Sequence, residues 1–443
     1  MVTELKQTEN TYQEAFRSMR AQQPESNVAW FERLRRTSME RFEELGLPTV
    51  RDEEWKYTNI APIARMDFKA STSAAPANDS DLIGLGVYEA RDSKLVFVNG
   101  KFRSELSTVA ALPNSVVAID LAAAINDPRY NEIVWKHLAQ EADYVTEAFV
   151  ALNTALLSQG AFVLIPKGMG IKVPIHLQFI SDGTERSNFP RVLVIAEENS
   201  SGTVIESYES TGDQEYFTNA VVEIVLKDGA KLEHYKIQRE SPSSFHIATT
   251  AADLGAASSY DSTTITFGGQ LSRHEINVRM DHEGAECWVD GLYVVTTEQH
   301  ADTHSLIDHR KPHCTSHQLY KGILDGKSRA VFNGKVFVRH DAQKTDAMQT
   351  NKNLLLSNEA RVDTKPQLEI LADDVKCAHG AAVGQISEDE LFYLEARGIH
   401  TDLARNLLTY GFAEEVIGKI KVDSIRKQLD AAVLNRLNAR LEA

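Results

Sequence analysis

Turn-like signals of the form Gly-x-x-apolar recur at a nearly constant interval through the middle of this 443-residue chain. They are SSGTVIE at Gly202, KDGAKLE at Gly229, DLGAASS at Gly255 and HEGAECW at Gly284, with weaker copies at Gly326 and Asn358. The first four are separated by 27, 26 and 29 residues. A fixed period of about 20–50 residues is typical of solenoids. This period is too short for a four-stranded propeller blade and suits one β-helix coil of two or three strands, with apolar side chains alternating inward and stacking on neighbouring coils.

The residues between these signals favour strands. From about residue 160 to 384, short runs rich in Val, Ile, Thr and Tyr alternate with Gly, Asp and Asn, and helical periodicity is absent. Many short strands predict a sandwich, a barrel or a β-solenoid. The repeat favours the solenoid; the alternative is that Gly and Asp simply mark turns, as they do in any all-β protein.

The segments before this region are predicted to be mainly helical. Residues 28–45 carry apolar side chains at nearly helical spacing. Residues 70–80 are small and polar, which indicates a linker or loop. LVFV at 95–98, followed by Asn99-Gly100, predicts a hairpin. Residues 117–158 are rich in Ala and Leu and again indicate helices.

The C-terminal segment also carries helical signals. Ser387 opens a Ser-Glu-Asp-Glu sequence that fits a capping box at a helix N-terminus. The last predicted helix has an apolar stripe at four-residue spacing, formed by Ile425, Leu429, Val433, Leu437 and Leu441. Such a stripe must be buried, either against the chain's own body or against a docking partner.

These patterns predict three domains. They are an N-terminal helical or mixed domain at 1–159, a β-helix core at 160–386 and a C-terminal helical domain at 387–443.

Charge and cysteine content narrow the function classes. The net charge of −16 disfavours nucleic acid and anionic membranes as general partners. Three cysteines are too few for a disulfide framework and indicate a reducing compartment. The first residues have no apolar run typical of a secretory signal, and no stretch is long and apolar enough to span a bilayer. We therefore expect a cytoplasmic protein.

A sequence near residue 325 resembles a nucleotide-binding loop but departs from it. GILDGKS at 322–328 has three residues between its glycines, whereas a P-loop needs four. RAVFNGKVFV follows, which predicts a strand where a P-loop requires a helix. We expect no nucleotide to bind here.

Histidines are concentrated between residues 300 and 317. His300, His304, His309, His313 and His317 lie there, with Cys314 among them. Imidazole and thiolate are good ligands for zinc or iron, but the spacing matches no known zinc motif. The alternative is a polar ladder along a solenoid face, or histidines bonded to their neighbours.

The tripeptide Cys377-Ala378-His379 is a second candidate for metal chemistry. On a strand, Cys377 and His379 share a face and form an adjacent pair of soft and borderline ligands. Two ligands are too few for a closed metal site. Another chain would have to supply the rest, and the alternative is a buried structural thiol. Templates for nucleophilic catalysis, such as Gly-x-Ser-x-Gly or His-Glu-x-x-His, are absent from the sequence.

Several long segments resemble one known family. They are SHQLYKGILDG at 316–326, AVFNGKVFVRHDAQKTDAMQTNKNLLLS at 330–357, KPQLEILADDVKCAHGAAVGQ at 365–385, DELFYLEARGI at 389–399 and RDEEWKYTNI at 51–60. Together they resemble the SufB/SufD family of iron–sulfur cluster assembly proteins. RDEEWKYTNI and the Gly380-Ala381 pair are similar to the SufD branch.

The resemblance implies a right-handed parallel β-helix between helical terminal domains. It implies a non-catalytic scaffold subunit that pairs with SufB through the β-helix and docks the ATPase SufC through its C-terminal helices. It also implies a transient iron–sulfur cluster at the seam with SufB, with His379 and Cys377 as metal ligands. The chain departs from the family at Ala378 and Ala382, where Ser and Thr are usual; this removes hydroxyls but no ligand.

Two other functions remain as alternatives. One is a SufB-like subunit that itself accepts sulfur on cysteine, which three cysteines and Gly380 make less favoured. The other is a β-helix enzyme acting on polysaccharide, which needs an open groove with clustered carboxylates and is usually secreted.

Overall fold

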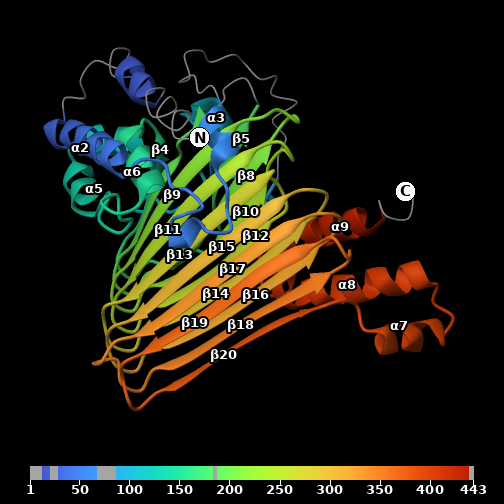
Figure 1. Cartoon of the computed structure of the whole chain (residues 1–443). Coiled ribbons are helices and arrows are strands. Elements are labelled where there is room, and N and C mark those ends of the chain that lie inside the picture. The colour runs from blue at the N-terminus through green and yellow to red at the C-terminus, as the bar shows by residue number, and fades with distance from the viewer. Residues whose placement is uncertain (1–11, 20–27, 67–85, 183–186, 439–443) are drawn as a thin grey trace.

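The computed structural model describes residues 12–19, 28–66, 86–182 and 187–438 (Figure 1). Its central feature is a β-solenoid built from two sheets that face each other, with helices at both ends of the chain. Successive strands alternate between the sheets, so each coil contributes one strand to each. The coil therefore has two strands, the smaller of the two numbers that the repeat length allowed.

Sheet A contains ten strands in the described chain. In spatial order they are β2 (Lys101–Phe102), β1 (Lys94–Val98), β5 (Ile175–Ser181), β8 (Ser201–Ser210), β10 (Lys231–Arg239), β12 (Ser259–Thr266), β14 (Glu286–Val295), β16 (Thr315–Leu324), β18 (Asp346–Leu355) and β20 (Lys376–Gly384). Pairing is parallel from β1 onward, and only β2 is antiparallel to its neighbour.

Sheet B faces sheet A across the core. In spatial order its strands are β19 (Arg361–Ile370), β17 (Arg329–Val338), β15 (His300–His309), β13 (Leu271–Met280), β11 (Phe245–Leu254), β9 (Phe217–Leu226), β7 (Arg191–Ala196), β4 (Gly160–Ile165) and β3 (Val117–Asp120). The short strand β6 (Ser187–Asn188) also pairs with β9.

The register confirms the predicted repeat length. The first residues of β8, β10, β12, β14, β16, β18 and β20 pair with one another, which gives coils of 27 to 31 residues. Equivalent residues of successive coils therefore stack directly and form rows along the solenoid.

Each of six successive sheet A strands is preceded by a turn residue with a positive φ. These residues are Asn199, Gly229, Ala257, Gly284, His313 and Lys344, with φ between 51° and 72°. The backbone N–H of each donates to a carbonyl in the next coil's turn; Gly229, for example, donates to Ala256 at 2.8 Å. This ladder of turns holds residues other than glycine in a conformation that they otherwise disfavour.

The glycine signals therefore had the right period but the wrong register. Gly229 and Gly284 occupy the positive-φ position, whereas Gly202 lies inside β8 and Gly255 precedes the turn residue Ala257 by two. The weaker copies at 326 and 358 belong to the opposite row of turns, before sheet B strands. The stacked hydrogen bonds fix the turn, so the chain does not need glycine at every copy.

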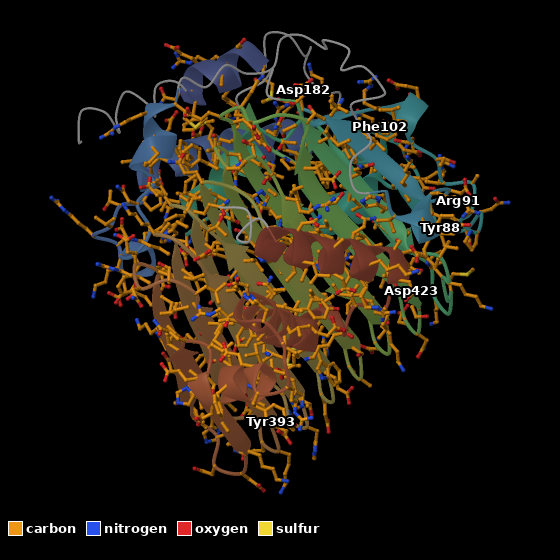
Figure 2. All side chains as sticks on the ribbon, turned by 90° about the vertical axis from the view of Figure 1, so that its right-hand side faces the viewer. Tyr88, Arg91, Phe102, Asp182, Tyr393 and Asp423 are labelled. Carbon is orange, nitrogen blue, oxygen red and sulfur yellow. The ribbon has the colours of Figure 1, made fainter. Side chains whose placement is uncertain are left out.

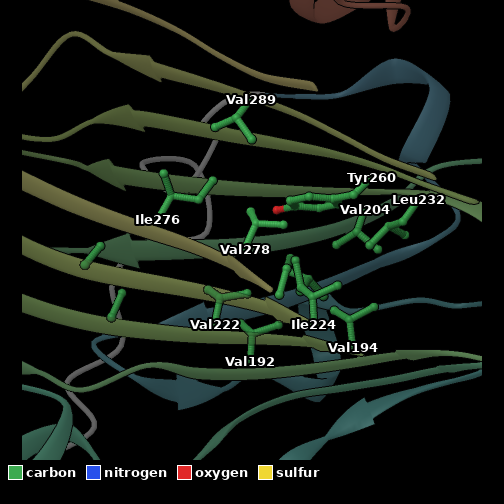
Figure 3. Close-up of a cluster of buried hydrophobic side chains, with 14 of the residues drawn as sticks. Val192, Val194, Val204, Val222, Ile224, Leu232, Tyr260, Ile276, Val278 and Val289 are labelled. Atoms are coloured by element: carbon green, nitrogen blue, oxygen red, sulfur yellow. The ribbon is translucent and has the colours of Figure 1, made fainter. Parts of the chain in front are cut away.

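Apolar side chains from both sheets fill the first coils (Figure 3). Val204 and Leu232 come from sheet A, and Val222 and Val278 from sheet B; all are almost completely buried. Full burial of such a side chain contributes about 1.5–3 kcal/mol relative to exposure. This contribution recurs in each coil whose inward residues are apolar.

The inward rows are not purely apolar, contrary to the sequence-based expectation. His234 Nε2 lies 2.5 Å from a Glu206 oxygen, and Lys236 Nζ lies 2.9 Å from His246 Nε2. His246 Nδ1 in turn lies 2.7 Å from a Glu240 oxygen. All five side chains are buried, and burial lowers the pKa of Lys236 to about 8. Charged residues are tolerated inside because they pair with one another.

The N-terminal segment covers the outer face of sheet B. Its main helices are α2 (Ala29–Leu45), α3 (Ala61–Arg65), α4 (Leu121–Asn126), α5 (Asn131–His137) and α6 (Ala148–Ala155). Phe31 and Leu121 pack there against Phe162 and Leu193. The predicted hairpin is confirmed as β1 and β2, with Asn99 and Gly100 at φ of 50° and 74°.

The C-terminal segment contains the helices α7 (Glu388–Glu395), α8 (Thr401–Ile417) and α9 (Asp423–Asn438). α8 and α9 cover the outer face of sheet A, whereas α7 packs on α8 and projects away from the sheet (Figure 1). Ser387 caps α7 by accepting the N–H of Glu390 at 3.4 Å. Ile425, Leu429 and Val433 are buried against sheet A, so this part of the stripe packs on the chain's own body. The side chain of Leu437 and all of Leu441 lie outside the described residues.

The start of α9 also contacts the N-terminal segment. The backbone N–H of Tyr88 donates to Ser424 Oγ at 3.3 Å, and Figure 2 shows Tyr88 near Asp423 on this side of the molecule. No helix among the described residues is long and apolar enough to cross a bilayer.

The predicted domain boundaries stay a prediction. β4 begins at Gly160 and α7 begins at Glu388, near both boundaries. Sheet A nevertheless continues across the first boundary, because β1 pairs with β5.

Candidate functional site

The C-terminal end of the solenoid is open. β19 is the last strand of sheet B and β20 is the last strand of sheet A, and no described strand pairs with their free edges. Every residue of β20 except Cys377 is exposed, whereas inward residues of the preceding strand β18 are buried. The end of the core is therefore accessible at the strand that carries the predicted ligands.

The backbone of β20 presents hydrogen-bonding groups at this edge. Lys376 N–H donates to Thr345 O at 2.8 Å, so residue 376 faces its neighbouring strand. In a parallel strand the N–H and C=O of alternate residues point in opposite directions. The backbone groups of Cys377, His379 and Ala381 therefore face the free edge.

Cys377 and His379 lie on one face of β20, as the sequence predicted, and the structure shows that it is the inner face. They are in register with Ala347 and Gln349, which point into the core. Cys377 is half-buried against an apolar cluster that includes Val336 and Ala347, and burial raises the pKa of its thiol. His379 is exposed because no further coil covers it. Among the described residues no three His, Cys, Asp or Glu side chains are placed to hold a metal, so this pair needs ligands from elsewhere.

The coil beneath this pair has a polar interior that the sequence analysis missed. Gln349 Nε2 donates to Gln318 Oε1 at 2.7 Å, and Gln318 Nε2 donates to Ser305 Oγ at 2.8 Å. Asn353 Nδ2 donates to Asn351 Oδ1 at 2.7 Å. The signal was present as polar residues at every second position of QTNKN, but the alternate positions are polar as well, so the inward face was not evident.

The histidines between residues 300 and 317 do not form one cluster. His309 points into the core, where its Nε2 lies 2.8 Å from Ser316 Oγ. His317 stacks on Trp288 on the outer face of sheet A, with ring centroids 6.0 Å apart. His313 is an exposed turn residue. His309 bonds across the core to a residue of sheet A, whereas His317 stacks on the neighbouring coil and His313 lies in a turn. This agrees with the alternative of histidines bonded to separate neighbours.

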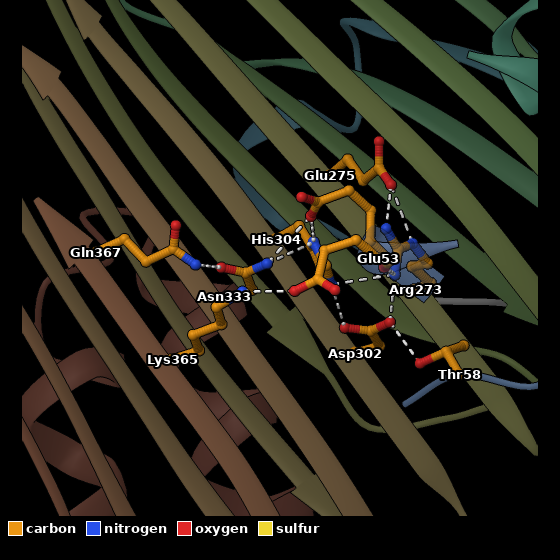
Figure 4. Close-up of polar contacts among 10 residues, drawn as sticks. Glu53, Thr58, Arg273, Glu275, Asp302, His304, Asn333, Lys365 and Gln367 are labelled. Carbon is orange, nitrogen blue, oxygen red and sulfur yellow. Dashed lines mark hydrogen bonds and ion pairs between the residues drawn. The ribbon is translucent and has the colours of Figure 1, made fainter. Parts of the chain in front are cut away.

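His304 is part of a cluster on the outer face of sheet B that we call the clasp (Figure 4). His300 adjoins it, with its Nε2 3.0 Å from Thr58 Oγ1. The clasp is formed by Glu53, Glu54 and Thr58 of the N-terminal segment with Arg273, Asp302, His304, Asn333 and Lys365 of the solenoid. Its elements span from β13 to β19, the last strand of sheet B.

The centre of the clasp is a buried ion pair. Arg273 Nη1 lies 2.6 Å from Asp302 Oδ2, and the same guanidinium lies over the ring of Trp55. His304 Nε2 lies 3.0 Å from Asp302 Oδ1, and its Nδ1 lies 3.2 Å from Glu54 Oε2. Burial alone would lower the pKa of His304, but the Asp302 carboxylate outweighs it and raises that pKa to about 9.

The clasp joins residues that are far apart in sequence. Thr58 donates to Asp302 at 2.6 Å, and Lys365 Nζ lies 3.0 Å from Glu53. RDEEWKYTNI had been singled out only for its resemblance to a family, because nothing local in it indicates partners more than 200 residues away.

Comparison with known proteins gives a consistent picture. Residues 179–412 match the family model described as SUF system FeS cluster assembly, SufBD core domain, and residues 6–177 match the SufBD protein N-terminal region. The chain belongs to the SufB/SufD family. This confirms the resemblance seen in the sequence.

Three relatives in this family are similar over most of their length. An iron–sulfur cluster assembly SufBD family protein of Synechocystis is 39% identical over 88% of this chain and 87% of its own. The iron–sulfur cluster assembly protein SufD of Escherichia coli is 32% identical over 88% and 90%. SufD of Bacillus subtilis is 27% identical over 91% and 93%.

Two further features of this SufB/SufD family member concern other chemistry. GILDGKS spans the end of β16 and a turn with Gly326 at φ 62°, and strand β17 follows, as expected for a sequence that is not a P-loop. Cys287 and Cys314 are buried, and burial raises the pKa of both thiols. Thiols held protonated inside the solenoid are poor nucleophiles.

A second exposed surface lies on α7 and α8. Phe392 and Tyr393 are 70% and 56% exposed, and Leu403 and Leu407 are also exposed. Figure 2 places Tyr393 at the outer end of this helical layer. Large apolar side chains gathered on adjacent helices are typical of a protein contact surface.

Proposed function

We propose that this chain is a SufD-type scaffold subunit that pairs with SufB and docks the ATPase SufC during iron–sulfur cluster assembly. One observation carries the proposal: the solenoid ends in an uncovered strand, and the two candidate ligands lie on that strand. The name SufD borne by the Escherichia coli and Bacillus subtilis relatives supports it.

Strand pairing is the contact that this end favours. β20 offers backbone N–H and C=O groups along nine residues, and an exposed edge of that length invites another strand. The other edge, β19, carries Pro366, which cannot donate there. Arg361 N–H donates to Ser328 O on the side of the neighbouring strand β17. The backbone groups of even-numbered residues of β19, such as residue 366, therefore face the free edge. β20 is thus the better template for a SufB strand.

A cluster at this seam would use ligands from both chains. Neutral imidazole and thiolate both bind iron, and here His379 and Cys377 sit on one face of the seam strand. Iron is the cargo in this scheme, and SufB would supply the remaining ligands. The raised pKa of Cys377 means that its thiol must lose a proton when iron binds, so we expect binding to weaken as the pH falls.

The C-terminal helices are suited to carry motion from SufC to the solenoid. Phe392, Tyr393 and Leu403 offer an apolar contact surface on one side. On the other side, Lys321 Nζ donates to Phe412 O at 2.9 Å, and Lys419 Nζ lies 2.7 Å from Asp290. We propose that ATP-driven closure of two SufC subunits pulls on these helices, shifts sheet A and opens the seam to iron and sulfur.

The chain itself would perform no catalysis. ATP hydrolysis belongs to SufC in this proposal. The sealed thiols of Cys287 and Cys314 disfavour the SufB-like alternative in which this chain accepts sulfur.

The test is reconstitution of the SufB–SufC–chain complex with His379→Ala. We expect the complex to assemble, because one exposed side chain contributes little to a large interface, and iron and cluster loading to fall. His340→Ala is the matched control, because His340 is an exposed histidine in a nearby turn. Unchanged loading in His379→Ala would refute the ligand role, and failure to co-purify SufB with the unmodified chain would refute the scaffold.

A further inference from the structure

A buried acceptor next to His379 has no partner within the chain. Gln349 lies on β18, is almost completely buried, and is in register with His379 on β20. Its Nε2 donates to Gln318 Oε1, but its Oε1 makes no hydrogen bond to any described residue. A buried oxygen left unpaired costs about 1–3 kcal/mol, so a donor is expected beside it.

The direction of the amide identifies where that donor must lie. β16, β18 and β20 are consecutive in sheet A. Because Gln349 Nε2 already donates to Gln318 on β16, the neighbouring strand that is left to supply a donor to Oε1 within sheet A is β20. Gly334 leaves space for this arrangement, because a Cβ there would lie 2.4 Å from Gln349 Nε2.

Among the inward residues of β20, His379 is the one suited to donate. The inner face carries Cys377, His379, Ala381 and Val383, and the alanine and valine have no side-chain donor. Cys377 is in register with Ala347 and packs into an apolar cluster. The imidazole N–H of His379 is therefore the remaining side-chain donor on this face of β20 that could reach Gln349 Oε1.

We infer that Gln349 is a positioning residue: its Oε1 accepts the N–H of neutral His379 and fixes the imidazole tautomer. The other ring nitrogen then presents its lone pair at the open end of the solenoid, where iron would bind. This rests on the proposed ligand role of His379. Metal-binding histidines are commonly held in this way, with the second ring nitrogen hydrogen-bonded to an oxygen, which also makes the ligand more basic.

The tautomer can be measured without iron. The full chain is labelled with ¹⁵N,¹³C-histidine, and the His379 ring signals are assigned by their loss in His379→Gln. We expect a single dominant tautomer in the unmodified chain and in Gln349→Glu, which keeps an acceptor. We expect Gln349→Leu to shift toward the mixture of free imidazole. Unchanged tautomer populations in Gln349→Leu would overturn the inference.

Asn351→Leu is the matched control. Asn351 is an equally buried amide on the same strand, but it is in register with Ala381. We expect it to leave the His379 tautomer unchanged, and a shift equal to that of Gln349→Leu would also overturn the inference. If Gln349→Leu does not fold, Gly334→Ala displaces the Gln349 amide without altering it and should produce the same tautomer shift.

Iron binding to the reconstituted complex separates this inference from the proposed function. We expect Gln349→Leu to weaken iron binding about 10–100-fold, and Gln349→Glu to restore most of it. If His379→Ala removes iron binding and Gln349→Leu does not weaken it, the positioning role fails and the proposed function stands. If His379→Ala has no effect on iron, the ligand role fails, and the tautomer measurement still decides whether Gln349 holds the ring.

Discussion

The two ends of the solenoid are built differently. At the N-terminal end the edge strands are β2 and β3, of two and four residues, and both run antiparallel to their neighbours. At the C-terminal end they are β19 and β20, of ten and nine residues, and both are parallel. Short edges offer little backbone for a further strand, whereas long edges offer much. The N-terminal end of the solenoid therefore offers little edge for another strand to pair with. The C-terminal end keeps long edge strands that a partner strand could pair with.

The largest expected effect comes from blocking the open edge. The N–H of Ala381 faces the free edge, so Ala381→Pro removes a donor needed by a partner strand but no bond to β18. We expect pairing with SufB to weaken more than about a thousandfold, or about 4 kcal/mol. Sedimentation of the purified pair measures it.

The control for this prediction is Ala381→Val, which keeps the N–H and favours a strand. The unfolding midpoint of the isolated chain should be nearly the same for both variants. Normal pairing of Ala381→Pro would mean that β20 is not the contact edge.

The closed end should instead depend on a buried ion pair. Arg191 and Glu223 are fully buried with 2.5 Å between Nη2 and Oε2, and Glu223 also accepts the N–H groups of Ala139 and Glu141, each at 2.9 Å. Glu223→Ala leaves the guanidinium unpaired, and we expect it to lower the free energy of unfolding by about 3 kcal/mol. Urea unfolding measures this.

Unlike its stability, the ability of Glu223→Ala to pair with SufB should be unchanged. Under conditions where Glu223→Ala remains folded, it should still pair, because the damage lies at the opposite end. A loss of pairing as large as that of Ala381→Pro would contradict the separation of the two ends.

The clasp should make the free energy of unfolding depend on pH, through the titration of His304. The folded pKa of His304 is about 9, against about 6.5 when unfolded. Because the folded pKa is raised, the contribution is complete below pH 6.5 and is lost as the pH rises through 9. We expect the free energy of unfolding to fall by about 3 kcal/mol across this range, and His304→Gln to remove that dependence.

Lys365→Ala is the control for the clasp and the smallest expected effect. Its pair with Glu53 is largely exposed, so we expect a loss below about 1 kcal/mol that diminishes in salt. A flat pH profile for the unmodified chain would show that His304 is not held charged by Asp302.

Most of the architecture could be predicted from patterns of residues that are close in sequence. The repeat length, the hairpin at Asn99-Gly100 and the cap at Ser387 were all readable because each depends on residues close in sequence. Cys377 and His379 could be assigned to one face because strand alternation is strict. The register of the turns was not readable, because ladder hydrogen bonds let Ala257 and His313 take a conformation usually left to glycine.

The sequence by itself predicted a solenoid with helical flanks and a Cys-x-His pair near the end of the repeat. Only the tertiary structure decided that this pair lies on an open edge, that Gln349 stands behind His379, and that Glu53 reaches Lys365 at a distance of 312 residues. Periodicity is a property of neighbouring residues, whereas these contacts arise only when coils stack in register and bring distant segments together.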